Sequence, residues 1–140
     1  IHREPRISFL SFSNFGSSKA NEAKKVKRAV KITKEKYPNL IVDGEMQADV
    51  AVNKSILDQL FDFNNLDEPT DILIFPDLSS ANISYKLLSQ LAEANAIGPL
   101  LIPMKSTVNI IQRTAPVSEI VNMCNLTALL SEEQNLNNKG

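Results

Sequence analysis

Residues 72–82 read ILIFPDLSSAN, and this stretch decides the fold. Its first four residues are all apolar, which is the pattern of a strand that is covered on both faces in a parallel sheet. Pro76 and Asp77 end that strand, and Ser79 or Ser80 can cap the helix that follows, whose apolar residues recur at helical spacing. A buried strand followed directly by an amphipathic helix predicts a layered α/β fold.

The sequence on the amino side of this stretch repeats the same alternation. Residues 7–13 predict a strand, and residues 19–37 predict an amphipathic helix with lysines on its outer face. A second short strand is expected at residues 40–42. Residues 54–61 then predict a short helix with Asn53 as its N-cap.

On the carboxyl side, residues 97–104 predict a strand whose pairing is interrupted by one glycine and two prolines. Another short strand is expected at residues 108–111. Pro116 then opens a helix, and the apolar stripe of this helix is expected to place Cys124 in the core. After Leu130 the sequence is polar and rich in asparagine, so we expect the chain to fray there.

Strands that alternate with helices predict a three-layer α/β fold, in which a mostly parallel sheet is flanked by helices. Ligands of such sheets bind at the carboxyl ends of the strands, where loops meet helix N-termini. Three loops fit this description, at residues 13–18, 76–82 and 112–119. These loops are the candidate binding loops.

The first two loops carry small polar residues ahead of a helix. Ser13, Gly16 and Ser17 form the first set, and Ser79 and Asn82 belong to the second. Hydroxyls and backbone N–H groups at a helix N-terminus suit a phosphate or another anion. The same residues also suit helix capping and turn formation, and the sequence leaves both interpretations open.

The third loop contains Gln112, Arg113 and Glu119. The Arg113 guanidinium could pair bidentately with a phosphate or carboxylate of a ligand. Alternatively, Arg113 could form an ion pair with Glu119 that steadies the start of the helix. Both interpretations remain open from the residues alone.

Composition limits the classes of function. The 140 residues contain 15 Lys and Arg against 16 Asp and Glu, so the formal charge is -1 and nothing favours nucleic acid or an acidic membrane surface as a partner. No apolar run approaches the ~20 residues of a spanning helix. The single cysteine favours a reducing compartment, and we expect a cytoplasmic protein. The sequence lacks a Walker loop, a GxGxxG motif and a metal-ligand cluster. Its start at Ile1 suggests a piece of a longer protein.

Four ordered motifs carry a resemblance to a known family. They are LSFSNFGSS at residues 10–18, VDGEMQAD at residues 42–49, LIFPDLSSANISYKLL at residues 73–88 and AIGP at residues 96–99. Together they resemble the carboxyl-terminal half of the phosphate acetyltransferase family. The resemblance implies that residues 1–133 are part of such a domain and that residues 134–140 are a polar tail.

Within that family the sequence resembles one branch more than the other. True phosphate acetyltransferases carry an Asn-Asp-Leu-Ser-Arg-Gly motif where this chain reads NIIQRT at residues 109–114. The resemblance therefore puts Gln112 at the position of the catalytic serine, Arg113 at the position of the phosphate-linked arginine and Glu119 at the position of a catalytic aspartate. The sequences of the motifs resemble the phosphotransacetylase-like tail of large bacterial NADP-dependent malic enzymes more than they resemble true phosphate acetyltransferases.

That resemblance implies a role as well as a fold. It implies a regulatory portion that binds acetyl-CoA and helps to assemble a homo-oligomer, through ligand residues among Ser13, Gly16, Ser17, Ser79, Asn82, Gln112 and Arg113. Oxidative decarboxylation of malate, with NADP and a divalent metal, is expected in a preceding part of the parent chain, and these residues alone are expected to be inactive. The alternative is a phosphate acetyltransferase that moves acetyl between CoA and phosphate, with Arg113 and Glu119 as its catalytic residues.

Overall fold

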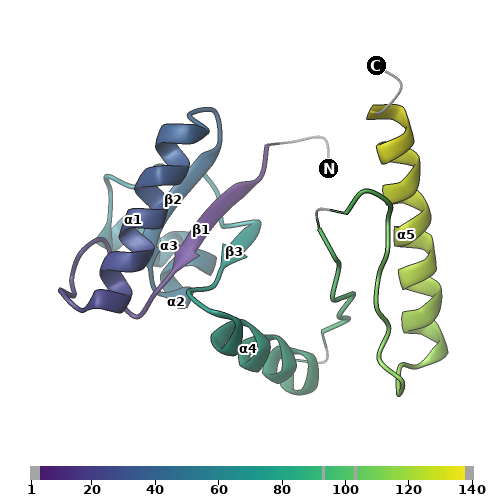
Figure 1. Cartoon of the computed structure of the whole chain (residues 1–140). Coiled ribbons are helices and arrows are strands. Elements are labelled where there is room, and N and C mark those ends of the chain that lie inside the picture. The colour runs from purple at the N-terminus through teal and green to yellow at the C-terminus, as the bar shows by residue number, and fades with distance from the viewer. Residues whose placement is uncertain (1–3, 93, 103, 138–140) are drawn as a thin grey trace. The chain divides into compact units, whose positions relative to one another are not determined.

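The computed structural model describes residues 4–92, 94–102 and 104–137. The chain divides into two compact units, Ile1–Ser84 and Tyr85–Gly140, and each is described by itself (Figure 1).

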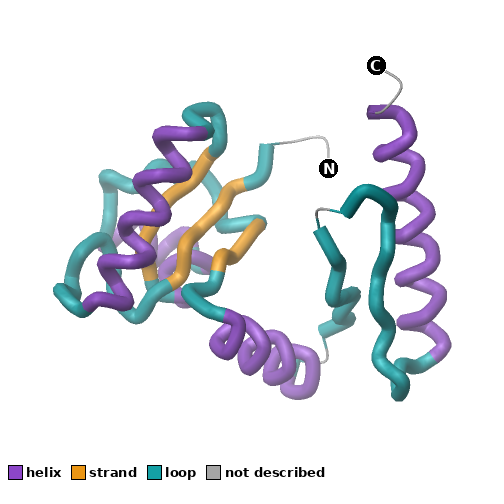
Figure 2. The backbone as a smooth tube through the Cα atoms, in the orientation of Figure 1, coloured by secondary structure: helices purple, strands orange, loops and turns teal. Residues whose placement is uncertain are grey.

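The first unit contains a three-stranded parallel sheet. Its strands are β1 (Arg6–Leu10), β2 (Ile41–Met46) and β3 (Ile72–Ile74), in the order β2-β1-β3 (Figure 2). Ile7 of the central strand is in register with Val42 on one side and with Ile72 on the other. The expected strand–helix alternation and the mostly parallel sheet are therefore confirmed.

Helices cover both faces of this sheet (Figure 1). Helix α1 (Asn21–Lys36) buries Ala23, Val26 and Val30, which lie on one face at helical spacing. Helices α2 (Ala48–Val52) and α3 (Lys54–Leu60) cover the other face, where their apolar side chains join those of the sheet. That second core cluster consists of Leu10, Met46, Val50, Ala51, Leu57 and Leu66. Each large side chain buried in this way stabilises the unit by about 1.5–3 kcal/mol.

One predicted helix cap is confirmed, and another is wrong. Asn53 caps α3 as predicted, because its Oδ1 accepts hydrogen bonds from the Ser55 and Ile56 backbone N–H groups at 3.1 and 3.3 Å. Helix α4 (Leu78–Leu91) begins before both predicted serine caps, so Ser79 and Ser80 lie inside its first turn. Asp77 is its cap, since Asp77 Oδ1 accepts from the Ser80 backbone N–H at 2.8 Å. The short helix α2 was not predicted.

Asp43 ties three elements of the first unit together. Its side chain is buried at the sheet, and its Oδ1 accepts from Lys34 Nζ of α1 at 2.9 Å. Its Oδ2 accepts from the backbone N–H of Asn65, in the loop between α3 and β3, at 2.8 Å. The next residue, Gly44, has φ +129°, and a Cβ there would lie 2.7 Å from the backbone oxygen of Phe9.

Strand β3 is less covered than its sequence predicts. We expect a strand buried on both faces, but Ile72 and Ile74 are 40% and 37% exposed. The apolar run indicates that these side chains favour burial, but it does not indicate which other element covers them. Within the described residues, β3 pairs only with β1.

The second unit contains the carboxyl-terminal turns of α4, a largely extended segment and helix α5 (Val117–Asn137). The two predicted strands at residues 97–104 and 108–111 are wrong, because their described residues form only one antiparallel bridge, between Leu100 and Asn109. Gly98 and Pro99 explain the difference, since glycine weakens a strand and proline cannot donate to the ladder. Residue 103 lies outside the described residues.

Helix α5 is turned away from its predicted orientation. Cys124 is exposed, and its neighbour Met123 is buried instead, so the placement of Cys124 in the core is wrong. The more buried positions recur at Met123, Leu126, Thr127 and Leu130, which form a helical stripe of their own. The helix also continues past Leu130, where Gln134 Nε2 donates to the Met104 carbonyl at 3.2 Å. Residues 138–140 of the predicted polar tail lie outside the described residues.

No helix in the described ranges is long and apolar enough to span a membrane.

Candidate functional site

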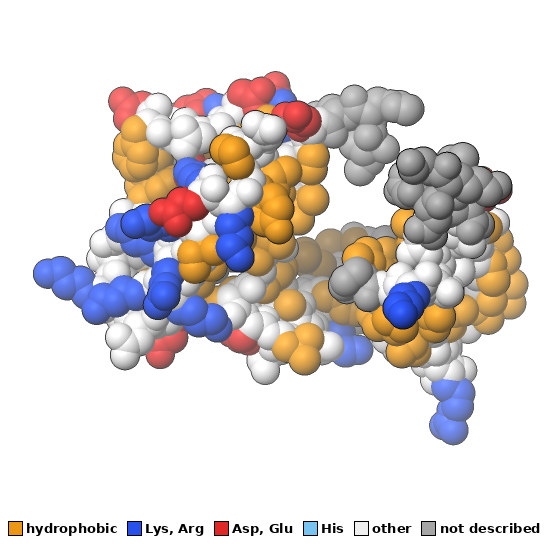
Figure 3. Space-filling model, turned by 45° about the horizontal axis from the view of Figure 1, so that its top comes forward, with side chains coloured by type: hydrophobic (Ala, Val, Ile, Leu, Met, Phe, Trp, Pro, Cys, Tyr) orange, Lys and Arg blue, Asp and Glu red, His pale blue; other side chains and the backbone are white. Residues whose placement is uncertain are grey.

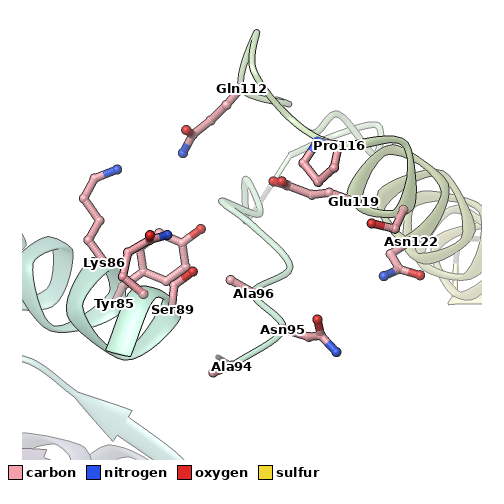
Figure 4. Close-up of a pocket in the computed structure, with 12 residues that line it drawn as sticks. Tyr85, Lys86, Ser89, Ala94, Asn95, Ala96, Gln112, Pro116, Glu119 and Asn122 are labelled. Carbon is pink, nitrogen blue, oxygen red and sulfur yellow. The ribbon is translucent and has the colours of Figure 1, made fainter. Parts of the chain in front are cut away.

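A cavity of about 510 Å³ lies within the second unit (Figure 4). Its walls come from the last turns of α4, from the chain that follows α4 and from the first turns of α5. The lining residues are Tyr85, Lys86, Ser89, Gln90, Ala94, Asn95, Ala96, Gln112, Pro116, Ser118, Glu119 and Asn122. Amides and hydroxyls dominate this lining, with one lysine and one carboxylate, so the cavity suits a polar ligand.

Local structure explains how the carboxyl-terminal wall is built. The Gln112 carbonyl accepts from the Ala115 backbone N–H at 3.0 Å, which turns the chain just before α5. The Pro116 carbonyl then accepts from the N–H groups of Glu119 and Ile120 at 3.1 and 3.2 Å, so Pro116 opens the helix as predicted. Glu119 is thereby held on the first turn, where its carboxylate extends toward the cavity in Figure 4.

Helix α4 supplies the opposing wall. Lys86 and Gln90 lie one turn apart on it, as do Tyr85 and Ser89, so their side chains share one side of the helix. In Figure 4, the Gln112 amide extends from its loop toward the side on which Lys86 lies. The arrangement can hold an anionic group near Lys86 and Gln112, with Glu119 as a separate acceptor.

The structure separates the three residues of the predicted third loop. Gln112 and Glu119 both line the cavity, whereas Arg113 is exposed and is not among the lining residues. The alternative ion pair between Arg113 and Glu119 is absent from the contacts of the described residues. Of the candidates in this loop, only Gln112 and Glu119 are therefore brought together.

The loop at residues 13–18 is held by a buried carboxylate. Glu45, 1% exposed, accepts through Oε1 from Ser13 Oγ at 2.9 Å and from the Gly16 backbone N–H at 2.6 Å. Ser13 Oγ in turn accepts from the Ser18 backbone N–H at 3.0 Å. Ser17 Oγ accepts from the Asn14 backbone N–H at 2.9 Å.

These contacts describe a loop whose polar groups bond to one another. Ser13 is fully buried, and its hydroxyl bonds within the protein, while Gly16 and Ser17 are exposed. Glu45 also places a buried carboxylate beside these donors, and its Oε2 has no hydrogen-bond partner among the described residues. Turn formation, which was one of the two open interpretations, accounts for the hydroxyl contacts in this loop.

The middle loop behaves as a capped helix start. Ser79 and Asn82 are exposed on the first turns of α4, and neither is part of the cavity lining. The backbone N–H of Ser80 holds the pKa of the Asp77 carboxyl below its usual value near 3.8, because the hydrogen bond favours the charged form. Asp77 therefore remains an ionised cap over most of the pH range.

Sequence reasoning missed the wall that α4 contributes. Tyr85 and Lys86 lie inside the motif at residues 73–88 and Ser89 follows it directly, whereas the ligand groups expected from sequence are confined to the loop before the helix. Their polar character at spacings of three and four on a predicted helix was the available signal. Among the described residues, no group of three or more His, Cys, Asp or Glu side chains is arranged to hold a metal ion.

Surface charge on the view in Figure 3 gathers on the first unit, where lysine and arginine side chains stand beside apolar ones. Helix α1 contributes several lysines to the first unit, and its Lys34 is paired with Asp43.

Comparison with known proteins places the fold and the cavity in a family context. The phosphate acetyl/butaryl transferase family matches residues 1–128. The NADP-dependent malic enzyme of Haemophilus influenzae is 40% identical over 120 residues, which are 84% of this chain and 16% of that protein. The phosphate acetyltransferase of Clostridium acetobutylicum is 40% identical over 110 residues, which are 79% of this chain and 33% of that protein.

Solved structures of phosphotransacetylases are similar to this chain in fold and in sequence. A phosphotransacetylase from Streptococcus pyogenes has a TM-score of 0.85 at 34% identity, and the match covers 94% of this chain and 40% of that one. The EutD phosphotransacetylase from Staphylococcus aureus has a TM-score of 0.82 at 31% identity. The chain thus spans less than half the length of these relatives. The expected resemblance and fold class are confirmed.

Proposed function

Because the chain belongs to the phosphate acetyl/butaryl transferase family, we propose that it is the regulatory, acetyl-CoA-binding portion of an NADP-dependent malic enzyme. A phosphate acetyltransferase-like domain occurs both in phosphate acetyltransferases and in NADP-dependent malic enzymes. Two candidate functions are therefore weighed, a regulatory role within a malic enzyme and acetyl transfer. The identity of one cavity residue favours the first.

That residue is Gln112. It lines the cavity, and the family resemblance puts it at the position of the serine in the transferase motif. A serine hydroxyl can donate a proton to a developing charge or exchange one with a base, whereas a carboxamide offers donors and an acceptor that do not titrate. A ligand can therefore still be bound beside Gln112, but the group proposed to support transfer has been lost. This observation supports binding without turnover.

The polar lining supports the proposed ligand. Acetyl-CoA carries amides, a thioester carbonyl and phosphates, and the cavity offers amide and hydroxyl partners together with the single cation Lys86. Of the residues expected from sequence, Gln112 remains in direct reach of a ligand. Arg113 is proposed as a contact at the edge of the site, while Ser13, Gly16, Ser17, Ser79 and Asn82 are proposed only as residues that shape their loops.

Regulation requires more than binding. Acetyl-CoA can shift a malic enzyme between two states only if it binds one of them more tightly. We propose that this domain, over residues 1–133, binds acetyl-CoA. The conformational change would be transmitted through an interface between subunits of a cytoplasmic homo-oligomer. Such an interface would convert a local ligand contact into a change at the distant catalytic part.

Malate decarboxylation itself is proposed for the rest of the parent chain. NADP and a divalent metal would act there. The described residues provide no metal-ligand cluster, and the sequence has no GxGxxG motif, so the residues present do not fit either group. No step of that reaction is assigned to them.

Phosphate acetyltransferase activity is the second candidate. Glu119 favours it, because its carboxylate faces the cavity at the position where the transferases have an aspartate. Under this alternative, Arg113 would hold phosphate and Glu119 would polarise its partner.

Two measurements on the full-length gene product separate the candidates. Calorimetric titration with acetyl-CoA is expected to show binding, and CoA-dependent consumption of acetyl phosphate is expected to stay at background. A Gln112→Ser variant is the matched control, because it restores the hydroxyl of the transferase motif at the same position. Transfer by the unaltered protein at a rate well above background would refute the regulatory proposal.

A further inference from the structure

We propose that Lys86 of α4 holds a phosphate group of the ligand in the cavity of the second unit, a role that sequence analysis gives to Arg113. The inference rests on the proposed function, because it assumes that the cavity takes a phosphorylated acetyl compound. It adds a specific residue and a specific chemical group to that function.

Charge is the first argument. Among the residues that the structure describes, Lys86 is the only lysine or arginine that lines the cavity. Its amino group makes no ion pair or hydrogen bond within the described part of the chain, in contrast with Lys34, which pairs with Asp43, and Lys25, which donates to the Pro76 carbonyl. A cation without a protein partner beside a cavity is free to pair with an anion that enters it.

Geometry is the second argument. In Figure 4, Lys86 and the Gln112 amide lie on one side of the cavity, and the Glu119 carboxylate extends into it from α5. A phosphate between Lys86 and Gln112 would receive one charge-assisted hydrogen bond and one amide hydrogen bond. The Glu119 carboxylate would repel that phosphate if it were seated against α5, so the available position is on the α4 side.

Arg113 does not meet these conditions. It is adjacent to Gln112 in the chain but is absent from the cavity lining. Arg113 lies in the turn that the Gln112 carbonyl closes with the Ala115 backbone N–H at 3.0 Å, and only Gln112 of these two neighbours lines the cavity. The cation that sequence order suggests is therefore replaced by one that α4 supplies.

The phosphate could belong to acetyl phosphate or to CoA, and the experiment distinguishes them. Calorimetric titrations of the full-length gene product use acetyl-CoA and acetyl phosphate in separate arms. The variants are Lys86→Gln, Lys86→Arg, Arg113→Gln and Lys105→Gln. Lys105 is the matched control, because it is an exposed lysine of the same unit outside the cavity. Circular dichroism checks that each variant is folded.

Lys86→Gln is expected to lower the affinity for at least one of the two ligands by about 10- to 100-fold, which is the loss typical of a charge-assisted hydrogen bond. Lys86→Arg should recover part of the affinity, and Lys105→Gln should have no effect. Added salt should weaken binding to the unaltered protein more than binding to Lys86→Gln, because screening acts on the charge that this variant lacks. The ligand that responds identifies the source of the phosphate.

Other outcomes are equally informative. Unchanged affinities in Lys86→Gln would overturn the inference, as would a loss confined to Arg113→Gln. If acetyl phosphate binds through Lys86 while acetyl-CoA does not bind at all, the acetyl-CoA proposal fails and the assignment of Lys86 stands. If neither compound binds to the unaltered protein, both proposals fail.

Discussion

Replacing Ser13 with alanine distinguishes a structural loop from a ligand-binding loop. The Ser13 hydroxyl is fully buried, donates to the Glu45 carboxylate and accepts from the Ser18 backbone N–H. Alanine removes both contacts, together with a third one to Ser17 Oγ at 3.2 Å, and leaves the half-buried Ser18 backbone N–H without its partner. It also leaves Glu45 Oε1 with Gly16 N–H as its remaining donor.

The expected loss follows from those two contacts. A hydrogen bond to a charged group contributes about 1.5–3 kcal/mol, and a neutral one about 0.5–1.5 kcal/mol. Ser13→Ala is therefore expected to lower the free energy of opening of this loop by about 2–4 kcal/mol. Converted at 1.4 kcal/mol per factor of ten, the protection of its amides should fall by about 30- to 1,000-fold.

Hydrogen exchange of the full-length gene product measures this loss locally. Peptides that span residues 11–19 report the amides of the loop, and peptides from α5 report an unrelated region. Ser17→Ala is the matched control, because Ser17 is exposed and its hydroxyl bonds only to Asn14 N–H and to the Ser13 hydroxyl within the described residues, with no contact to Glu45. It should cost only about 0.5–1.5 kcal/mol.

A result with the opposite pattern would refute this reasoning. If Ser13→Ala left exchange in residues 11–19 unchanged and weakened acetyl-CoA binding instead, the hydroxyl would be a ligand contact, and the closed network around Glu45 would not describe its role.

Gly44→Ala should destabilise the first unit by about 2–4 kcal/mol, because a side chain at φ +129° is strained and its Cβ would meet the Phe9 carbonyl. Urea unfolding followed by circular dichroism measures this loss, and an unchanged unfolding midpoint would contradict the prediction. Asn53→Ala removes the cap of α3 and should cost about 0.5–2 kcal/mol, seen as faster amide exchange in that helix alone. The pKa of Asp77 is lowered by its bond from Ser80 N–H, so the cap of α4 is fully effective above about pH 3.8 and is lost as the pH falls through the lower folded pKa. Asp77→Asn keeps an acceptor that does not titrate, so its α4 exchange, corrected for intrinsic rates, should lose this acid dependence; equal acid dependence in both proteins would exclude Asp77 as the cap.

Local patterns of the sequence predict the first unit well. The helix at residues 19–37 and the strand at residues 72–75 are observed as α1 and β3, each slightly shorter than predicted. Their signals come from neighbouring residues in the chain, such as helical apolar spacing and the Asn53 cap. Such signals are largely independent of what packs against the element.

The second unit shows what local patterns miss. Residues 97–111 are apolar enough for strands, but the described part forms a single bridge, because strand formation needs a partner of suitable register as well as suitable side chains. Cys124 was placed in the core for a similar reason. Its stripe on α5 is apolar, but the helix buries the stripe that contains Met123.

The candidate site was half predictable. Gln112 and Glu119 could be found because they flank a helix start in a motif, where chain position and chemistry coincide. Lys86 could be found only as a polar position on a predicted helix, because its place in the cavity depends on how α4 and the loop before α5 approach each other, which no local pattern encodes. Arg113 illustrates the converse, because it follows Gln112 in sequence but is not among the residues that line the cavity.

The carboxylate of Asp43 has a consequence for how the first unit opens. Its two oxygens bond separately to α1 and to the loop before β3, so neither of these elements can detach without leaving a buried charge short of a partner. Local fluctuations that would otherwise be independent are thereby coupled into one cooperative opening event. Amides on both sides of Asp43 should then exchange with a shared opening free energy, which would mark α1, β2 and this loop as a single folding unit.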